Sequence, residues 1–332
     1  MAAFVALRTL SEGIPLLAAI DAVRMMDALP DPQPGGGEVR IRIAASGINP
    51  GDIKKRQDSF GLGMPYPRVI PHSDGAGQVD QVGEGVSSEW VGRPVWCYGA
   101  QSYRPFGTAA EFTVVPLDHL APLPDKVSPE EGACLGIPGI TAHRAVFVGG
   151  AVAGQTILVQ GAGGAVGMCA VALAHHGGAR VIGTARSPAE EPAARTAGAQ
   201  EVVLNDQGLV AGVKALAPDG VDHIVEVAFG ANIDVDVEML KMGGSIGAYA
   251  TDNATPKIPF WQMVFKNIRV FFLGSDDFPT AAKVAATQDL NDALQAGWAG
   301  FEIGEHIPLA EIARAHELVE HPLRRGRVVV TV

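Results

Sequence analysis

A glycine-rich turn near the middle of the chain carries the clearest chemical signal in the sequence. The apolar run 157–159 leads through Gln160 into residues 161–167 (GAGGAVG), and an apolar helical pattern follows. This A-x-G-x-x-G register is the dinucleotide-binding fingerprint with Ala at the first glycine, where Gly164 admits a pyrophosphate and Gly167 allows close packing of helix on strand. The helix N-terminus supplies free amide groups and a positive dipole end. A purely structural turn is the alternative, but the flanking strand and helix favour a dinucleotide site.

The end of the next predicted strand bears on which nicotinamide cofactor would bind. An NAD site usually has an acid there, about 20 residues beyond the glycines, to hold the ribose 2′-hydroxyl. Here the first acid is Glu190, whereas Arg186 could pair with a 2′-phosphate and Ser187 could hydrogen-bond it. The sequence therefore favours NADPH, the alternative being that Arg186 is an ordinary solvated loop residue.

Two further strand ends are predicted to face the same crevice, because ligands of open parallel sheets lie beyond the carboxyl ends of the strands. These ends are residues 226–230 (EVAFG) and 249–251 (YAT). Phe229 and Tyr249 could pack against a nicotinamide ring, or could equally be hydrophobic residues at the rim of the site.

The elements that must position these residues fall into two groups. Short strands are expected at 39–43, 75–82, 94–98 and 109–115, a spacing typical of a β-barrel or sandwich. From residue 155 strands alternate with helices, which predicts a doubly wound parallel sheet. The predicted strands are 156–160, 179–184, 201–204, 221–227, 245–249 and 269–273. Ser128 is expected to cap a helix, and helices over 281–296 and 309–320 precede a terminal strand at 327–332.

Composition excludes several classes of protein. The net charge is −11 and no basic cluster exceeds Lys54-Lys55-Arg56, so nucleic acid is not an expected partner. The 3 cysteines, Cys97, Cys134 and Cys169, form no C-x-x-C pair, which argues against a disulfide framework or a four-cysteine zinc lobe. No apolar run reaches about 18 residues and no secretory leader is evident, so we expect a soluble cytoplasmic protein without a membrane partner.

Taken in order along the chain, these motifs resemble the medium-chain dehydrogenase/reductase superfamily, and within it the zinc-free, zeta-crystallin-like quinone oxidoreductase branch. Besides the glycine-rich turn, the resemblance rests on residues 46–52 (SGINPGD), 72–77 (HSDGAG), 135–145 (LGIPGITAHRA) and 220–226 (GVDHIVE). It implies an α/β protein with a GroES-like, β-rich catalytic domain over 1–124 and 278–332 and a Rossmann NADP(H)-binding domain over 125–277. It further implies a homodimer formed through the nucleotide domains, with 270–273 as an apolar pairing edge.

The resemblance also bears on zinc. Where the zinc alcohol dehydrogenases of the superfamily place their metal ligands, this chain has Asn49, Ser73-Asp74 and Pro138, which cannot supply a shell of thiolate and imidazole. His72 is displaced by one residue, so neither a catalytic nor a structural zinc is expected. Without a Lewis acid, the suitable acceptors are those whose own conjugation spreads the incoming charge, such as a quinone or an α,β-unsaturated carbonyl.

The activity implied is NADPH:quinone oxidoreduction, with hydride passing from nicotinamide C4 to the acceptor in the cleft between the domains. The open alternatives are reduction of the C=C bond of an enone, enal or enoyl thioester, and a cofactor-binding protein without turnover. The residues predicted to contact the cofactor are Thr141, Gly163, Gly164, Ala165, Val166, Arg186, Ser187, Asn205, Gly230, Tyr249, Ala250, Thr251, Val270, Phe271 and Phe272.

Two residues of the β-rich part are candidates for catalysis. Lys54 stands where the family usually has a tyrosine lining the nicotinamide pocket, and an ammonium there could donate a proton or hydrogen bond to an enolate or quinone oxygen. Asn49 could orient a substrate carbonyl. The alternatives are that Lys54 is solvated within its basic run and that Asn49 only caps its turn.

Overall fold

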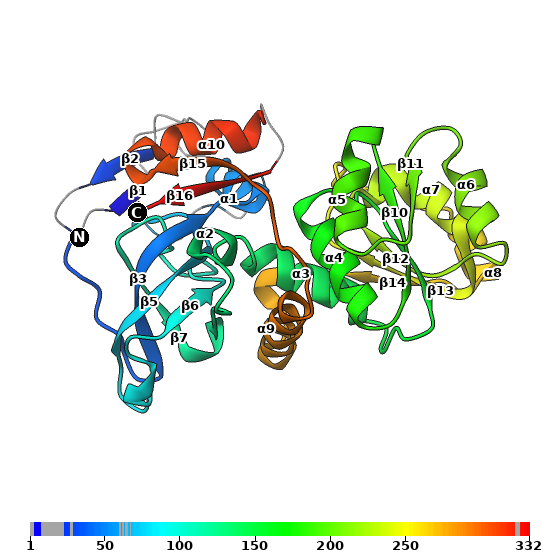
Figure 1. Cartoon of the computed structure of the whole chain (residues 1–332). Helices are drawn as coiled ribbons and strands as arrows, with labels where there is room; N and C mark the ends of the chain where they lie inside the picture. The colour runs from blue at the N-terminus through cyan, green and yellow to red at the C-terminus, as the bar shows by residue number, and fades with distance from the viewer. Residues whose placement is uncertain are drawn as a thin grey trace. The chain divides into compact units, whose positions relative to one another are not determined.

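The computed structural model describes residues 3–7, 23–26, 29–59, 61, 63, 66, 68–322 and 326–332. The chain divides into two compact units (Figure 1). Unit 1 comprises Met1–Ile137 and Phe301–Val332, and unit 2 comprises Pro138–Gly300. These boundaries lie later in the chain than the predicted 124/125 and 277/278. The second boundary follows from packing: α9 (Thr280–Gln295) contacts α4 of unit 2, and its Leu290 side chain lies against Gly139 in α3.

Unit 2 contains the predicted doubly wound sheet. Its strands are all parallel and run in the order β11-β10-β9-β12-β13-β14, the order typical of a dinucleotide-binding fold. Their bounds are β9 (Thr156–Val159), β10 (Arg180–Ala185), β11 (Glu201–Leu204), β12 (Val221–Glu226), β13 (Leu240–Ala248) and β14 (Arg269–Phe272). Only β13 departs clearly from its predicted extent, because it begins at Leu240 and two glycines, Gly243 and Gly244, lie between that residue and the predicted start at 245.

Five helices connect successive strands of this sheet: α4 (Ala165–His176), α5 (Glu191–Thr196), α6 (Leu209–Leu216), α7 (Phe229–Met239) and α8 (Phe260–Phe265). α3 (Gly136–Phe147) precedes β9, and α9 follows β14. Leu158, Ile182, Ile224 and Ile246, one from each central strand, form a buried core with apolar residues of α6 and α7. Because side chains alternate along a strand, the residues beside them point to the opposite face, and α4 contacts β9 and β10.

Unit 1 is built around the long strand β3 (Glu38–Gly47). One half of β3 pairs with β7 (Phe112–Pro116), the other half pairs with β16 (Arg327–Thr331), and both halves pair with β5 (Asp74–Val82). The predicted alternation is observed, since Val39, Ile41 and Ile43 are buried in one core cluster. The remaining strands of this sheet are β6 (Pro94–Cys97), β8 (Leu120–Pro122) and β15 (Ile303–Pro308).

A second sheet and the helices complete unit 1. The sheet consists of β1 (Ala3–Leu7), β2 (Val23–Met26) and β4 (Arg68–Val69), and the helices are α1 (Pro50–Arg56), α2 (Pro129–Gly132) and α10 (Ile312–Glu320). As predicted, Ser128 caps α2: its Oγ accepts the Glu131 amide at 3.2 Å and its own amide donates to Glu131 Oε2 at 2.8 Å. Figure 1 shows α10 lying along β15 and β16, whose apolar residues it covers. Sequence reasoning missed β15, which presents the polar residues Glu305 and His306 and buries Ile307.

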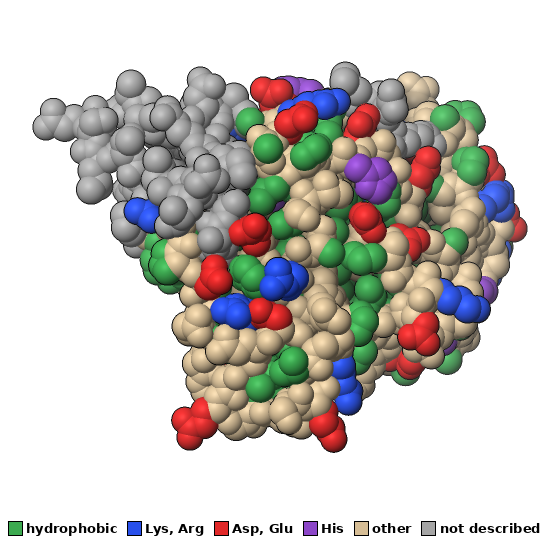
Figure 2. All heavy atoms as spheres, turned by 60° about the vertical axis from the view of Figure 1, so that its left-hand side comes forward, with side chains coloured by type: hydrophobic (Ala, Val, Ile, Leu, Met, Phe, Trp, Pro, Cys, Tyr) green, Lys and Arg blue, Asp and Glu red, His purple; other side chains and the backbone are tan. Residues whose placement is uncertain are grey.

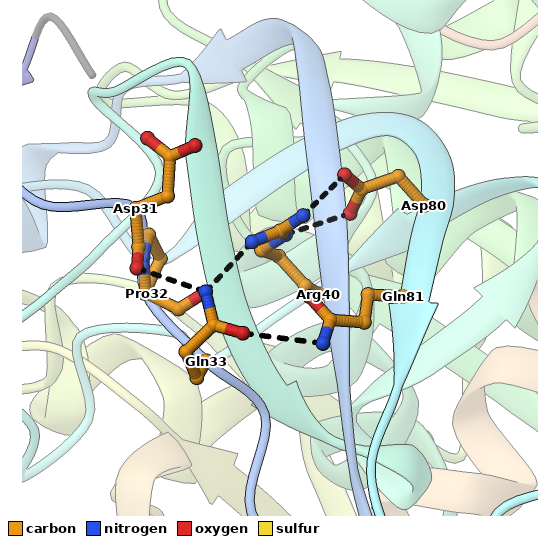
Figure 3. Close-up of polar contacts among 6 residues, drawn as sticks. All are labelled: Asp31, Pro32, Gln33, Arg40, Asp80 and Gln81. Atoms are coloured by element: carbon orange, nitrogen blue, oxygen red, sulfur yellow. Dashed lines mark hydrogen bonds and ion pairs between the residues drawn. The ribbon is translucent and has the colours of Figure 1, made fainter.

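An ion pair fastens β3 to the neighbouring strand β5. Arg40 donates through Nε and Nη2 to both carboxylate oxygens of Asp80, at 2.9 and 2.8 Å, and through Nη1 to the carbonyl of Pro32 (Figure 3). Gln81 on β5 donates to Gln33 on the same side. On the face drawn in Figure 2, acidic and basic side chains are interspersed rather than gathered by sign.

Candidate active site

The glycine-rich turn forms a backbone cradle at the N-terminus of α4. Gly161 adopts φ +68°, a left-handed conformation that favours glycine, and its carbonyl accepts the Gly164 amide at 2.9 Å. A Cβ at Gly167 would lie 2.1 Å from the Gly161 carbonyl oxygen, so no other residue fits there without displacing the turn. The amides of Ala165 and Val166 belong to the first helical turn, where no carbonyl of the helix can accept them. The cradle therefore fits a phosphate group.

A buried hydrogen-bond network connects this turn to β10 and α7. Thr184 Oγ1, at the end of β10, accepts the Gly161 amide at 2.9 Å and donates to Gln160 Oε1 at 2.9 Å. Gln160 Nε2 in turn donates to Asp236 Oδ1 of α7 at 2.8 Å. The network ties the ends of β9 and β10 to α7 and thereby fixes the conformation of the cradle.

Two buried carboxyl groups lie at the far end of this network. Glu226 closes β12 and accepts the Ala228 amide and the side chain of Asn232, and Asp236 lies one helical turn beyond Asn232. Burial raises the pKa of both carboxyl groups, and the charge of Glu226 raises the pKa of Asp236 further. Sequence reasoning did not assign Gln160, Asp236 or the Glu226 carboxyl a role. The available signal was that Gln160 and Glu226 are polar residues at the ends of apolar strands, whereas Asp236 lies within α7 and has no such signal.

The loop after β10 carries the residues predicted to recognise the adenosine ribose. Arg186 follows the strand directly, and its guanidinium donates to Glu190 Oε1 through Nε at 3.0 Å and Nη2 at 2.7 Å. Ser187 begins the turn that leads to Glu190, whose amide donates to the Ser187 carbonyl. Asn205 lies nearby, because its amide donates to the carbonyl of Ala185 at 2.8 Å. The structure thus brings Arg186, Ser187 and Asn205 together at the end of β10.

The predicted residues on the nicotinamide side also gather at neighbouring strand ends. The Gly230 amide donates to Thr251 Oγ1 at 3.2 Å, and the Phe229 amide donates to the Ala250 carbonyl at 3.1 Å. These contacts hold together the segments that follow β12 and β13. Both segments were predicted to face the same crevice. Burial raises the pKa of the Tyr249 phenol, whose backbone amide donates to the Glu226 carbonyl.

The remaining predicted cofactor residues occupy different surroundings. Phe272, at the end of β14, is 72% exposed and meets Phe229 edge-on, with ring centroids 5.1 Å apart. Val270 and Phe271 are half-buried on the same strand, and Thr141 is buried in α3. Their roles toward a cofactor stay predictions.

In unit 1, the candidate catalytic residue Asn49 is buried and held on both sides of its amide. Its Nδ2 donates to Asp74 Oδ2 at 2.6 Å, and its Oδ1 accepts Arg327 Nη2 at 2.7 Å. Both polar atoms of the side chain are therefore engaged by residues of the same unit. This arrangement favours a positioning role over direct contact with a substrate carbonyl. Lys54 lies five residues further on, half-buried at the end of α1.

Asp74 is the centre of this buried cluster. Besides Asn49, its carboxylate accepts the Ile137 amide at 2.9 Å, and a Cβ at Gly136 would lie 2.2 Å from its Oδ1. Burial raises the pKa of Asp74 to about 7, with a further contribution from the charge of Asp52. The Asn49 and Ile137 hydrogen bonds oppose that shift because they favour the ionised form.

The positions that would hold a catalytic zinc do not fit the metal. Asn49 is engaged as described, Ser73 and Asp74 are buried, and Pro138 has no donor side chain. His72 is held elsewhere: its Nδ1 lies 2.8 Å from Ser46 Oγ and its Nε2 lies 3.2 Å from Nε2 of His316. Among the residues that the structure describes, no three His, Cys, Asp or Glu side chains are grouped as metal ligands would be.

Comparison with known proteins identifies two family models in the chain. Residues 35–125 match the alcohol dehydrogenase GroES-like domain, and residues 165–287 match the model described as zinc-binding dehydrogenase. These matches cover the β-rich part and the parallel-sheet part respectively, and they confirm the predicted combination of a GroES-like and a Rossmann fold. The described part of the chain contains no helix with the length and apolar character needed to span a bilayer.

Individual relatives cover almost the whole chain. Quinone oxidoreductase of Rattus norvegicus is 32% identical over 87% of both chains, and that of Mus musculus is 33% identical over the same share. Among solved structures, a mycobacterial quinone oxidoreductase matches with TM-score 0.83 and 26% identity, covering 100% of both chains. A mycobacterial protein solved in complex with NADPH matches with TM-score 0.81 and 26% identity over the same share. The chain belongs to the quinone oxidoreductase family of the medium-chain dehydrogenase/reductase superfamily.

Proposed function

We propose that the protein is an NADPH-dependent, zinc-independent oxidoreductase that reduces quinones. The observation that carries this proposal is the cradle at the N-terminus of α4, which lies at the switch point of the parallel sheet with Arg186 at the end of the adjacent strand. The relatives named quinone oxidoreductase and the structural neighbour solved with NADPH support it. A reaction site in a cleft between the domains, and a location in the cytoplasm, stay predictions.

The residues of unit 2 have distinct tasks in this proposal. The amides of Gly164, Ala165 and Val166 would hold the pyrophosphate, and Arg186 would pair with the 2′-phosphate. Gly230 and Thr251, joined by their hydrogen bond, would line the nicotinamide side. When bound, NADPH supplies a hydride from C4 of its nicotinamide. The protein then has chiefly to orient the two reactants and exclude water.

Zinc-independence is supported by the chemistry of the residues that stand at the zinc-ligand positions. A catalytic zinc needs ligands that these positions do not provide. They hold the Asn49 amide, which Asp74 and Arg327 engage, together with Ser73, Asp74 and Pro138. We expect the purified enzyme to carry less than about 0.1 zinc per chain and to keep its activity after dialysis against a chelator. Metal analysis by mass spectrometry, together with activity restored or not by added zinc, tests this. Stoichiometric zinc whose removal abolishes turnover would contradict it.

Steady-state oxidation of NADPH with parallel acceptors tests the main proposal. A small benzoquinone, a larger naphthoquinone and a matched enone are compared under identical conditions. We expect turnover with the quinones, and their ranking reports the size of the acceptor pocket. Turnover confined to the enone would transfer the function to C=C reduction. Binding of NADPH without turnover of any acceptor would leave a cofactor-binding protein.

Lys54 distinguishes quinone reduction from the runner-up reaction. In enone reduction a proton must follow the hydride to the α-carbon, so a donor is required there, whereas a hydroquinone anion can take its proton from water. We expect Lys54→Ala to lower enone turnover at least tenfold and to leave quinone turnover within about twofold. Lys54→Arg keeps the charge but cannot give up its proton, so it should behave like alanine toward enones. Equal effects of both variants on both substrates would remove the donor role.

We further propose a homodimer formed through β14 and α8 of unit 2, with a second copy of the chain as the partner. β14 is one of the two edge strands of the sheet, and Phe272, Trp261 and Phe265 are 72%, 64% and 71% exposed. An apolar edge of this kind is a template for strand pairing and would otherwise invite aggregation. We expect sedimentation to give a dimer and Phe265→Asp to shift it toward monomer. A wild-type monomer at micromolar concentration would contradict this proposal.

A further inference from the structure

The loop after β10 returns a carboxylate to the end of that strand. In the sequence, Glu190 lies several residues beyond the strand end where the acid that binds the ribose of NAD is expected. In the structure, however, Glu190 Oε2 accepts the backbone amide of Arg186, the first residue beyond β10, at 2.9 Å. The carboxylate therefore stands where the acid of an NAD site would stand, although it is contributed by a residue four positions further along the chain.

Glu190 also borders the glycine-rich turn. A Cβ built on Gly163 would lie 3.1 Å from both the Cβ and the carbonyl oxygen of Glu190. The residue thus touches the cradle on one side and the end of β10 on the other. A nucleotide whose pyrophosphate lies in the cradle would place its adenosine ribose in this neighbourhood.

The Glu190–Arg186 pair differs from the ordinary surface ion pairs of the same spacing. In the pair Glu191–Arg195 the glutamate side chain is 36% exposed, and in Glu89–Arg93 it is 79% exposed, whereas the Glu190 side chain is 18% exposed. Arg186 itself is 83% exposed, so its guanidinium is open to an incoming ligand while the carboxylate stays fixed by the Arg186 amide. For the Glu191–Arg195 and Glu89–Arg93 pairs we find, within the residues that the structure describes, no such backbone hydrogen bond that holds the carboxylate in place.

We propose that Glu190 is a specificity-determining residue for the dinucleotide, which accepts the ribose 2′-hydroxyl of NADH and opposes the 2′-phosphate of NADPH. This inference rests on the proposed dinucleotide-dependent function. The Arg186 guanidinium is paired with this carboxylate and is itself exposed, so it can bridge Glu190 to a 2′-phosphate and offset part of the repulsion. The consequence is an enzyme that prefers NADPH only modestly and also accepts NADH.

The test compares the dissociation constants of NADPH and NADH for the wild type and for Glu190→Gln, measured by titration of nucleotide fluorescence. The amide keeps the size of the side chain and removes its charge. Because like charges in close apposition disfavour binding strongly even after screening, we expect Glu190→Gln to raise the selectivity for NADPH over NADH about tenfold or more. Glu191→Gln is the matched control, since it removes the neighbouring carboxylate of a solvated pair and should leave selectivity within about twofold.

A fragment of the cofactor gives a second readout that does not depend on turnover. Adenosine 2′-monophosphate, used as a competitor, should bind Glu190→Gln more tightly than wild type by a similar factor, whereas adenosine 5′-monophosphate should not. A selectivity unchanged by Glu190→Gln, in a protein that binds NADPH, would overturn the role of Glu190 and leave the proposed function intact. If the wild type binds neither dinucleotide, it is the proposed function that fails.

Discussion

The candidate sites of the two units differ in whether backbone or side-chain atoms would meet a ligand. In unit 2 the groups that would meet a ligand are backbone amides of the glycine-rich turn, and the side chains of Gln160, Thr184 and Asp236 lie beneath them as supports. In unit 1 the candidate groups are side chains that already have hydrogen-bond partners within the protein. Asn49 bonds to Asp74 and Arg327, and Asp74 also accepts the Ile137 amide.

The contrast explains why the cradle of unit 2 could be predicted from the sequence and the arrangement around Asn49 in unit 1 could not. A backbone site needs glycine at defined spacings, and glycine spacing is visible in the sequence. A side-chain site depends on where each polar atom points, which is fixed by residues far away in the chain. Asn49 illustrates this, because Asp74 of β5 accepts from the Nδ2 donor that a substrate carbonyl would otherwise have used, and Arg327 of the last strand donates to its Oδ1.

The largest expected effect would break the backbone site. A valine at position 167 would drive its Cβ into the Gly161 carbonyl, so we expect Gly167→Val to weaken NADPH binding more than 100-fold and to lower the free energy of unfolding by about 3 kcal/mol. Gly274→Ala is the control, because a Cβ there meets nothing within 4 Å. Fluorescence titration and urea unfolding measure both effects. Near-normal binding by Gly167→Val would refute the cradle.

The second prediction concerns the buried carboxyl group of unit 1 and its pH dependence. The folded state raises the pKa of Asp74 to about 7, above its unfolded value, so the fold binds this proton more tightly. The free energy of unfolding should therefore fall as pH rises from about 4 to about 7, and this group should contribute no further change above that range. Its contribution is up to about 4 kcal/mol, because each unit of pKa is about 1.4 kcal/mol.

Asp74→Asn removes that titration while keeping an oxygen acceptor. Urea unfolding at intervals between pH 5 and 8 should show the wild type losing stability relative to the variant up to about pH 7 and levelling off above it. Parallel stability profiles of the two proteins would show that Asp74 does not bind its proton more tightly in the fold.

A third, smaller effect separates positioning from substrate contact at Asn49. Truncation in Asn49→Ala deprives Asp74 and Arg327 of one partner each, which should lower the free energy of unfolding by about 2 kcal/mol. If Asn49 acts by positioning, KM for the quinone should stay within about threefold while stability falls. Unchanged stability with a large rise in KM would instead show that the amide contacts substrate.

The smallest prediction sharpens the comparison between buried and exposed ion pairs within unit 1. Arg40 holds Asp80 with two hydrogen bonds and both side chains are less than a quarter exposed, so Arg40→Met should cost about 1 kcal/mol. Arg93→Met, in a pair at 3.9 Å with half or more of each side chain exposed, should cost less than about 0.5 kcal/mol. Thermal melts of the two variants measure the difference. Equal destabilisation by both would argue against any special contribution of the Arg40 contact.

Much of the fold could be predicted from local pattern. Strict alternation over 39–43 indicated β3, and the register of the parallel strands follows the apolar runs, because periodicity is a local property of the chain. β15 and the early start of β13 could not be predicted in this way, since glycines interrupt the apolar pattern of both segments and their strand pairing is long-range. The later boundary between the units depended on the packing of α9 against α4 and α3, and that is also a long-range choice.

The sequence by itself determined the order and type of most elements, the glycine spacing of the cradle and the lack of a thiolate–imidazole set at the zinc positions. Only the tertiary structure decided that Glu190 returns to the end of β10, that Asn49 is held by Asp74 and Arg327, and that buried carboxyl groups lie near the cradle. The physical reason is that helical and strand periodicities are set by neighbours in sequence, whereas the direction and partners of a polar side chain are set by neighbours in space.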